Sequence, residues 1–117
     1  MRIRAAALVI MLASPLTAEE VTATPGAILR GLDKVSGVAT DLTIKNGGSA
    51  EYGTLKVTVS DCRLPKDNPA ADAYAHLKIA NASGTVLFDG WMVATSPALS
   101  ALDDPRYDVW VMRCISS

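Results

Sequence analysis

The sequence contains little of what metal and catalytic sites are built from. It has one histidine and two cysteines among its 117 residues. A zinc site needs about four Cys, His or carboxylate ligands, so pairing of the two cysteines would leave too few. No Gly-x-Ser-x-Gly segment is present to display a nucleophilic serine. The composition therefore indicates no metal and no cofactor.

Basic residues are neither abundant nor clustered. The sequence has eleven lysines and arginines and twelve acidic residues, and its formal net charge is −1. Proteins that bind nucleic acids concentrate basic side chains to hold the phosphates. Nucleic acid is therefore disfavoured as a partner.

An apolar run long enough to cross a bilayer, about 20 residues, is also missing. The stretch Ala5 to Ala13 is shorter, follows Arg2 and Arg4, and ends before Ser14-Pro15. A positive start, a short apolar core and a small residue at the cut are typical of a signal peptide, which we expect to be cleaved after Ala18. The alternative is an uncleaved amphipathic anchor. We expect an exported protein with no integral membrane span after cleavage.

Removal of residues 1–18 takes away two arginines and no acids, which leaves nine basic residues against twelve acidic ones. The mature chain is then mildly acidic, with a formal net charge of −3. Residues 19–26 are polar and contain Pro25, which predicts a flexible leader. Residues 27–117 are predicted to form a single all-β domain, near the size at which one core is adequate but thin.

Cys62 and Cys114 are the two cysteines, and both lie in the mature part. An exported protein meets an oxidising compartment, so a disulfide between them is predicted. The alternatives are a metal pair and a redox-active pair. Both fit poorly because the two cysteines are widely separated and lack the Cys-x-x-Cys spacing.

The hydrophobic pattern of the domain has a period of two in several short segments. Apolar and polar residues alternate along residues 38–44, 55–60 and 74–79, and an earlier strand is expected at 28–34. Such alternation is typical of half-buried strands. The turn residues Asn46-Gly47-Gly48 and Asn81-Ala82-Ser83-Gly84 separate these segments. The sequence predicts a mainly β fold, a small antiparallel β-sandwich or barrel.

One short helix is expected near residues 96–102. Ser96 suits the position before a helix, and Pro97 suits its first turn. A strand is expected from Tyr107 to Arg113, with Trp110 and Met112 on the same side as Cys114.

Strict alternation conflicts with the predicted disulfide at Cys62. It places Cys62 on the polar side of its strand, with Lys56, Thr58 and Ser60. Either a bulge near Ser60-Asp61 turns Cys62 inward, or the disulfide lies at the end of the strand.

His76 is the one histidine that a Ser-His-Asp hydrolase could use, with Ser96 as a candidate nucleophile. Alternation instead places His76 on the outside of its strand, beside Tyr74 and Lys78. We therefore predict an exposed, non-catalytic histidine.

Four aspartates flank the expected helix and could converge as oxygen ligands for calcium. They are Asp89, Asp103, Asp104 and Asp108. Their spacing matches no calcium-binding loop, and Asp103-Asp104 is also ordinary turn chemistry before a proline. No pair of carboxylates stands out as a glycosidase pair.

Large side chains gather around the expected helix, although the whole sequence has only six aromatic residues. Aromatic residues with a polar tip are enriched where proteins bind partners. The candidate partner-binding residues are Trp91, Met92, Pro97, Tyr107 and Trp110. The alternative is that Trp91 and Trp110 fill the core of a small domain.

The segment from Phe88 to Cys114 carries a family resemblance. Its Gly90-Trp91-Met92, Ser-Pro-Ala-Leu, Pro-x-Tyr-Asp-Val-Trp-Val and final cysteine resemble the secreted bacterial family catalogued as domain of unknown function 2155. The segments at residues 29–34 and 52–55 resemble the N-terminal half of that family. The resemblance implies an exported bacterial domain with two cysteines, and it carries no catalytic or binding residues.

Two classes of function are expected to compete. The first is a non-enzymatic periplasmic or secreted binding or accessory module, which holds an envelope protein or glycan at the surface between Gly90 and Tyr107. It requires an exposed aromatic patch. The second is a small hydrolase or metal-dependent enzyme, which requires His76 or the acidic set in a pocket. A purely structural envelope role is a third alternative.

Overall fold

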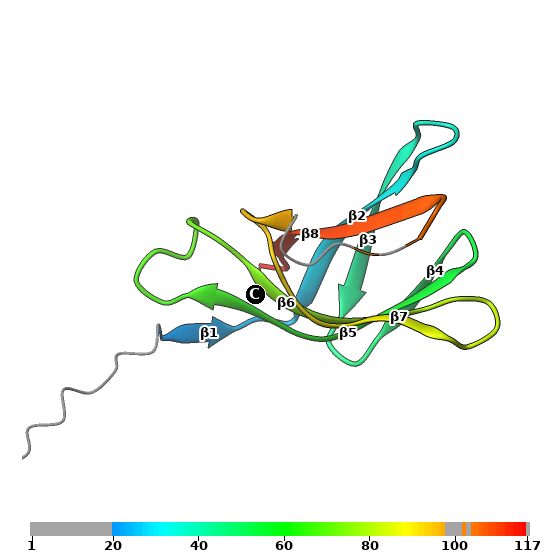
Figure 1. Cartoon of the computed structure of the whole chain (residues 1–117). Coiled ribbons are helices and arrows are strands. Elements are labelled where there is room, and N and C mark those ends of the chain that lie inside the picture. The colour runs from blue at the N-terminus through cyan, green and yellow to red at the C-terminus, as the bar shows by residue number, and fades with distance from the viewer. Residues whose placement is uncertain (1–19, 98–101, 103, 117) are drawn as a thin grey trace, which may run out of the picture.

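A computed structural model of the protein describes residues 20–97, 102 and 104–116 (Figure 1). Eight strands follow one another along the chain: β1 (Val21–Ala23), β2 (Gly26–Asp33), β3 (Ala39–Lys45), β4 (Ser49–Tyr52), β5 (Leu55–Pro65), β6 (Tyr74–Ala80), β7 (Val86–Val93) and β8 (Tyr107–Cys114). Among these described residues, no helix is long and apolar enough to cross a membrane. The short helix predicted near 96–102 falls mostly on residues 98–101, which lie outside the described residues.

The strands form two antiparallel sheets. β5, β6 and β7 are consecutive neighbours in a five-stranded sheet, and β1 and β4 both pair with the other edge of β5. The second sheet has three strands in the order β3-β2-β8. Figure 1 shows the two sheets as separate layers. The predicted mainly β, antiparallel fold is confirmed, and of the sandwich and the barrel that the sequence left open the two-sheet sandwich is the one found.

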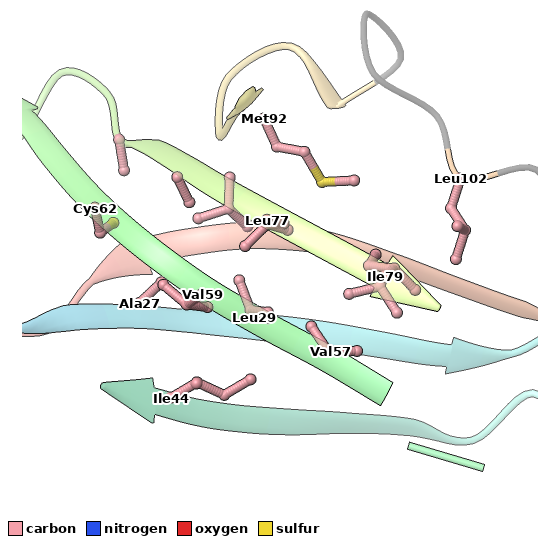
Figure 2. Close-up of a cluster of buried hydrophobic side chains, with 14 of the residues drawn as sticks. Ala27, Leu29, Ile44, Val57, Val59, Cys62, Leu77, Ile79, Met92 and Leu102 are labelled. Carbon is pink, nitrogen blue, oxygen red and sulfur yellow. The ribbon is translucent and has the colours of Figure 1, made fainter. Parts of the chain in front are cut away.

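The core lies between the sheets and is made by the apolar half of each alternating pattern. Val57 and Val59 of β5, Leu77 of β6 and Leu29 of β2 are fully buried. Figure 2 shows these side chains gathered in the space between the strands. Burial of a side chain of this size contributes about 1.5–3 kcal/mol to the free energy of unfolding, so alternation fixes which face of each strand turns inward.

The segment predicted as a flexible leader is partly a strand. β1 pairs with the end of β5, and the Thr24 amide and hydroxyl both donate to the Cys62 carbonyl at 2.9 and 2.8 Å. Glu20 also pairs with Lys66, with Nζ and Oε2 3.0 Å apart. The part of β5 that follows Thr58 lies beyond its pairing with β4. The leader segment bonds to the backbone groups that β5 would otherwise leave unpaired at this edge.

A bulge in β5 resolves the conflict over Cys62. Val59 pairs with Leu77 and Asp61 pairs with His76, so Ser60 is an extra residue in the ladder. The extra residue shifts the alternation by one position, and Cys62 becomes buried. Of the two explanations that the sequence left open, the bulge is the one found.

A second irregularity corrects the predicted faces of β8. Leu29 pairs with Val111 and Ile28 with Arg113, so Met112 is the extra residue. Trp110 therefore points outward with its neighbour Arg30, whereas Cys114 points inward. The prediction that Trp110 and Met112 share the side of Cys114 is wrong, because strict alternation does not continue through a bulge.

The two inward cysteines form the disulfide that joins the sheets. Cys62 of β5 and Cys114 of β8 are bonded, with their Cα atoms 5.7 Å apart. The bond links positions 52 residues apart in sequence and fastens the last strand to the opposite sheet. Loss of this constraint releases a long loop in the unfolded chain.

We expect the Cys62→Ala, Cys114→Ala double variant to lose about 4 kcal/mol of unfolding free energy, because a loop of this length gains that much entropy when the crosslink is removed. Urea unfolding of the two proteins measures the difference, and the reduced natural chain is the matched control. A loss below about 1 kcal/mol would contradict the account. Labelling of the denatured, unreduced chain should detect no free thiol, and uptake of two labels would exclude the bond.

Candidate functional site

The outward face of the five-stranded sheet carries the most exposed aromatic side chain. Register places His76 of β6 beside Trp91 of β7, and Tyr74 beside Val93. On the other side of β6, Arg63 of β5 pairs with Tyr74 and Asp61 with His76. We call this surface the Trp91 face; its side chains are Ser60, Asp61, Arg63, Tyr74, His76, Asp89, Trp91 and Val93.

Trp91 lies between two polar groups from neighbouring strands. The His76 ring meets it edge to face, with centroids 5.2 Å apart and planes at 73°. The Arg63 guanidinium carbon lies 5.3 Å from the centre of the Trp91 ring. Both contacts orient the indole, whose residue nonetheless remains 42% exposed. An aromatic side chain held in place but open to solvent is preorganised for contact with a partner.

The bulge residue Ser60 contacts His76 through its hydroxyl group. Its Oγ lies 2.6 Å from His76 Nδ1 and donates to the His76 carbonyl at 3.2 Å. On the other side of the ring, Nε2 lies 3.8 Å from the Asp89 carboxylate, which is beyond hydrogen-bonding distance. These contacts fix the position of His76 against Trp91.

A shallow hollow lies beside Trp91. Its volume is about 290 Å³, and its walls come from four strands. The lining residues are Val21, Arg63, Tyr74, Trp91 and Val93. This volume is at the lower end of the range for small-molecule pockets, roughly 300–1,000 Å³, and suits one or two side chains.

The structure does not bring the five predicted partner-binding residues together. Trp91 is exposed, Pro97 is exposed after β7, and Trp110 is half-buried on the outward face of the opposite sheet. Met92 and Tyr107 are 1% and 9% exposed and belong to the core. The prediction of a partner surface that includes Met92 and Tyr107 is corrected, because alternation turns both residues inward.

The candidate hydrolase residues are arranged differently from the sequence hypothesis. His76 lies on the outward face of β6, as alternation predicted, and the serine that contacts it is Ser60 rather than Ser96. Ser60 was missed because its position depends on the bulge. The one sequence feature that pointed to Ser60 was the conflict between strict alternation and the predicted disulfide at Cys62.

The four aspartates considered as calcium ligands do not form a cluster in the described residues. Asp89 lies near His76, whereas Asp104 accepts hydrogen bonds from the Arg106 and Tyr107 amides at 2.9 and 2.8 Å. Asp108 accepts from the Val109 amide, and Asp103 lies outside the described residues. Within the described part of the chain, no three His, Cys, Asp or Glu side chains are placed to hold a metal ion.

Comparison with known proteins places this chain in a family. Residues 27–114, from β2 to the end of β8, match the family described as an uncharacterised protein conserved in bacteria, domain of unknown function 2155. The chain belongs to this family. It is also 28% identical over 95 residues to an uncharacterised protein of Rickettsia prowazekii (strain Madrid E), a match that covers 78% of this chain and 61% of that relative. No solved structure matches.

Three segments that resemble the domain of unknown function 2155 family meet at one end of the sandwich. Tyr52 and Tyr107 pack edge to face with ring centroids 5.3 Å apart. Gly31 and Gly53 lie directly against these rings, and a Cβ atom at either glycine would overlap a tyrosine. Gly53 also has a φ of 57°, which favours glycine. The family segments at 29–34, 52–55 and 105–111 are therefore joined by packing here.

An ion pair closes the same end of the sandwich. Arg106 donates to Asp33 through Nη2 at 3.0 Å and through Nε at 3.3 Å, and the Val35 and Ser36 amides donate to the same carboxylate. The Arg106 hydrogen bonds are the main cause that lowers the pKa of Asp33 to about 2. The ion pair fastens the segment before β8 to the end of β2.

Because the folded-state pKa of Asp33 is lowered, its contribution to stability is complete above its ordinary pKa and is lost as the pH falls through about 2. We expect the unfolding free energies of the natural chain and the Asp33→Asn variant to converge between about pH 4 and pH 2. Urea unfolding at several pH values measures this convergence. Asp67→Asn, in an exposed loop, is the matched control. A difference that stays constant with pH would contradict the assigned role of the ion pair.

Proposed function

We propose that the protein is a non-enzymatic binding or accessory module of the bacterial cell envelope, which uses the Trp91 face to hold an envelope protein or glycan. The observation that carries the proposal is the 42% exposure of Trp91, while contacts from His76 and Arg63 orient its ring. Burying a tryptophan at an interface removes a large apolar area from water. Residues of this kind dominate the binding energy of many interfaces.

The proposed location is the periplasm or the exterior, reached through a signal peptide of residues 1–18. The disulfide between Cys62 and Cys114 supports this location, because disulfides persist in oxidising compartments and are rare in the cytosol. Membership of a family conserved in bacteria is consistent with an envelope role.

A hydrolase is the second candidate, and the observation that favours it is the 2.6 Å contact between Ser60 Oγ and His76 Nδ1. A histidine base adjacent to a serine is the first requirement of a serine nucleophile. Against this candidate, Asp89 is too distant to hydrogen-bond to the other ring nitrogen, and the pair lies on an open sheet face. Hydrolysis of generic esters that disappears in Ser60→Ala would favour this candidate over the binding module.

The binding proposal is tested by photo-crosslinking in cells from an aromatic photoreactive side chain at position 91, which keeps a ring where Trp91 contributes one. We expect capture of one reproducible envelope protein, or protection of the probe by a glycan without protein capture. A probe at Val35 is the matched control, because Val35 is 76% exposed at the tip of the β2–β3 hairpin and away from the Trp91 face. Equal capture from both positions would contradict a specific surface at Trp91.

The Trp91→Ala variant separates binding from folding. We expect it to lose capture from a second probe at Val93 while export and thermal stability are retained, because Trp91 is not part of the core. Trp91→Phe should retain part of the capture because it keeps an aromatic ring. Unfolding of both variants would assign Trp91 to the core and end the proposal.

A further inference from the structure

The Arg63 guanidinium is held in a fixed orientation at the edge of the hollow. Its Nε donates to Asp61 Oδ2 at 2.7 Å, and its central carbon lies 5.3 Å from the centre of the Trp91 ring. Within the described part of the chain, no hydrogen bond or ion pair engages its two Nη nitrogens. The Arg63 side chain is 44% exposed. The terminal edge of the guanidinium, which carries four N–H donors, therefore faces solvent.

The rest of the hollow is largely apolar. Val21, Tyr74, Trp91 and Val93 form its other walls, and among the described residues Arg63 is the one charged residue that lines it. Glu20, which precedes β1, is paired with Lys66. An apolar hollow with a single cation at its rim is complementary to a group that combines an apolar side chain with an anion.

We propose that the Trp91 hollow binds a protein segment in which an apolar side chain lies next to a carboxylate. The apolar side chain occupies the hollow against Trp91 and Val93, and the carboxylate accepts hydrogen bonds from the Nη nitrogens of Arg63. This proposal rests on the proposed function and names the chemistry of the partner. It involves no covalent step.

Arginine suits this role better than lysine would. Its planar guanidinium presents paired N–H donors that match the two oxygens of a carboxylate. The contacts with Asp61 and Trp91 already restrict the side chain, so less conformational freedom is lost when the carboxylate binds. A protein segment is the proposed source because the walls of the hollow come from valine, tyrosine and tryptophan side chains. The two valines, Val21 and Val93, offer the hydroxyl groups of a glycan no hydrogen-bonding partner, whereas they can pack against an aliphatic side chain.

The two tryptophans provide a reporter and an internal control for the test. Trp91 lies in the hollow, and Trp110 lies on the outward face of the opposite sheet. Their indole N–H resonances can be followed by NMR while the folded protein is titrated with N-acetyl leucyl-glutamate amide or with N-acetyl leucyl-glutamine amide. We expect both peptides to shift the Trp91 resonance and neither to shift that of Trp110. Because an exposed ion pair contributes modestly, the acidic peptide should bind about two- to fivefold more tightly.

Substitutions of Arg63 and of Asp61 should change the preference for the acidic peptide in opposite directions. Arg63→Gln should abolish the preference for the acidic peptide, and Arg63→Lys should retain part of it because the charge remains. Asp61→Asn should increase the preference, since it removes the carboxylate that competes for the guanidinium. Both positions are at least partly exposed, so a comparable melting temperature is the control for folding.

Three results would overturn the inference. Equal affinity for the two peptides would remove the carboxylate from the proposal and leave an apolar hollow. A preference that survives Arg63→Gln would assign the recognition to another cation. The absence of any shift at Trp91 would exclude this class of partner at the hollow. Because crosslinking from position 91 is a separate measurement, a positive result there would preserve the proposed function even if the peptides failed.

Discussion

The bulge at Ser60 is the constraint on which both the core and the Trp91 face depend. One extra residue in β5 turns Cys62 toward the core, where it bonds to Cys114 of the opposite sheet. The same extra residue leaves Ser60, Asp61 and Arg63 on the outward side, where they contact His76, each other and Trp91. Bulges commonly redirect side chains at functional surfaces. Here one irregularity positions the disulfide on one face of the sheet and the proposed binding surface on the other.

The two tryptophans lie in different surroundings although they are close in sequence. Trp91 lies on the five-stranded sheet among groups that orient it, and Trp110 lies on the three-stranded sheet beside Arg30. Arg30 is paired with Asp41, with Nε and Oδ1 2.8 Å apart. Trp110 is half-buried among its neighbours, whereas Trp91 is more exposed and borders a hollow. We therefore propose a partner surface on the five-stranded sheet at Trp91, and not along the whole segment from Trp91 to Trp110.

Much of the fold could be predicted from alternation and turn residues. The apolar positions of β5 and β6 identified the core, and the outward position of His76 followed from the same pattern. An extra residue shifts the phase of the pattern at Ser60 and at Met112. At Ser60 the conflict at Cys62 made a bulge one of two explanations, whereas no such conflict indicated the bulge at Met112. The contact between Ser60 and His76 and the outward position of Trp110 could not be predicted for this reason. β1 was missed because three residues show too little alternation, and their pairing depends on the length of β5.

The proposed binding surface depends most directly on the exposure of Trp91. This exposure can be measured directly from the two indole N–H resonances in the presence of a soluble paramagnetic agent, which broadens the signals of groups near solvent. We expect the Trp91 resonance to be broadened strongly and the Trp110 resonance less. A Trp91 resonance protected as well as the amides of the core strands would contradict the account, because a buried indole cannot form the proposed surface.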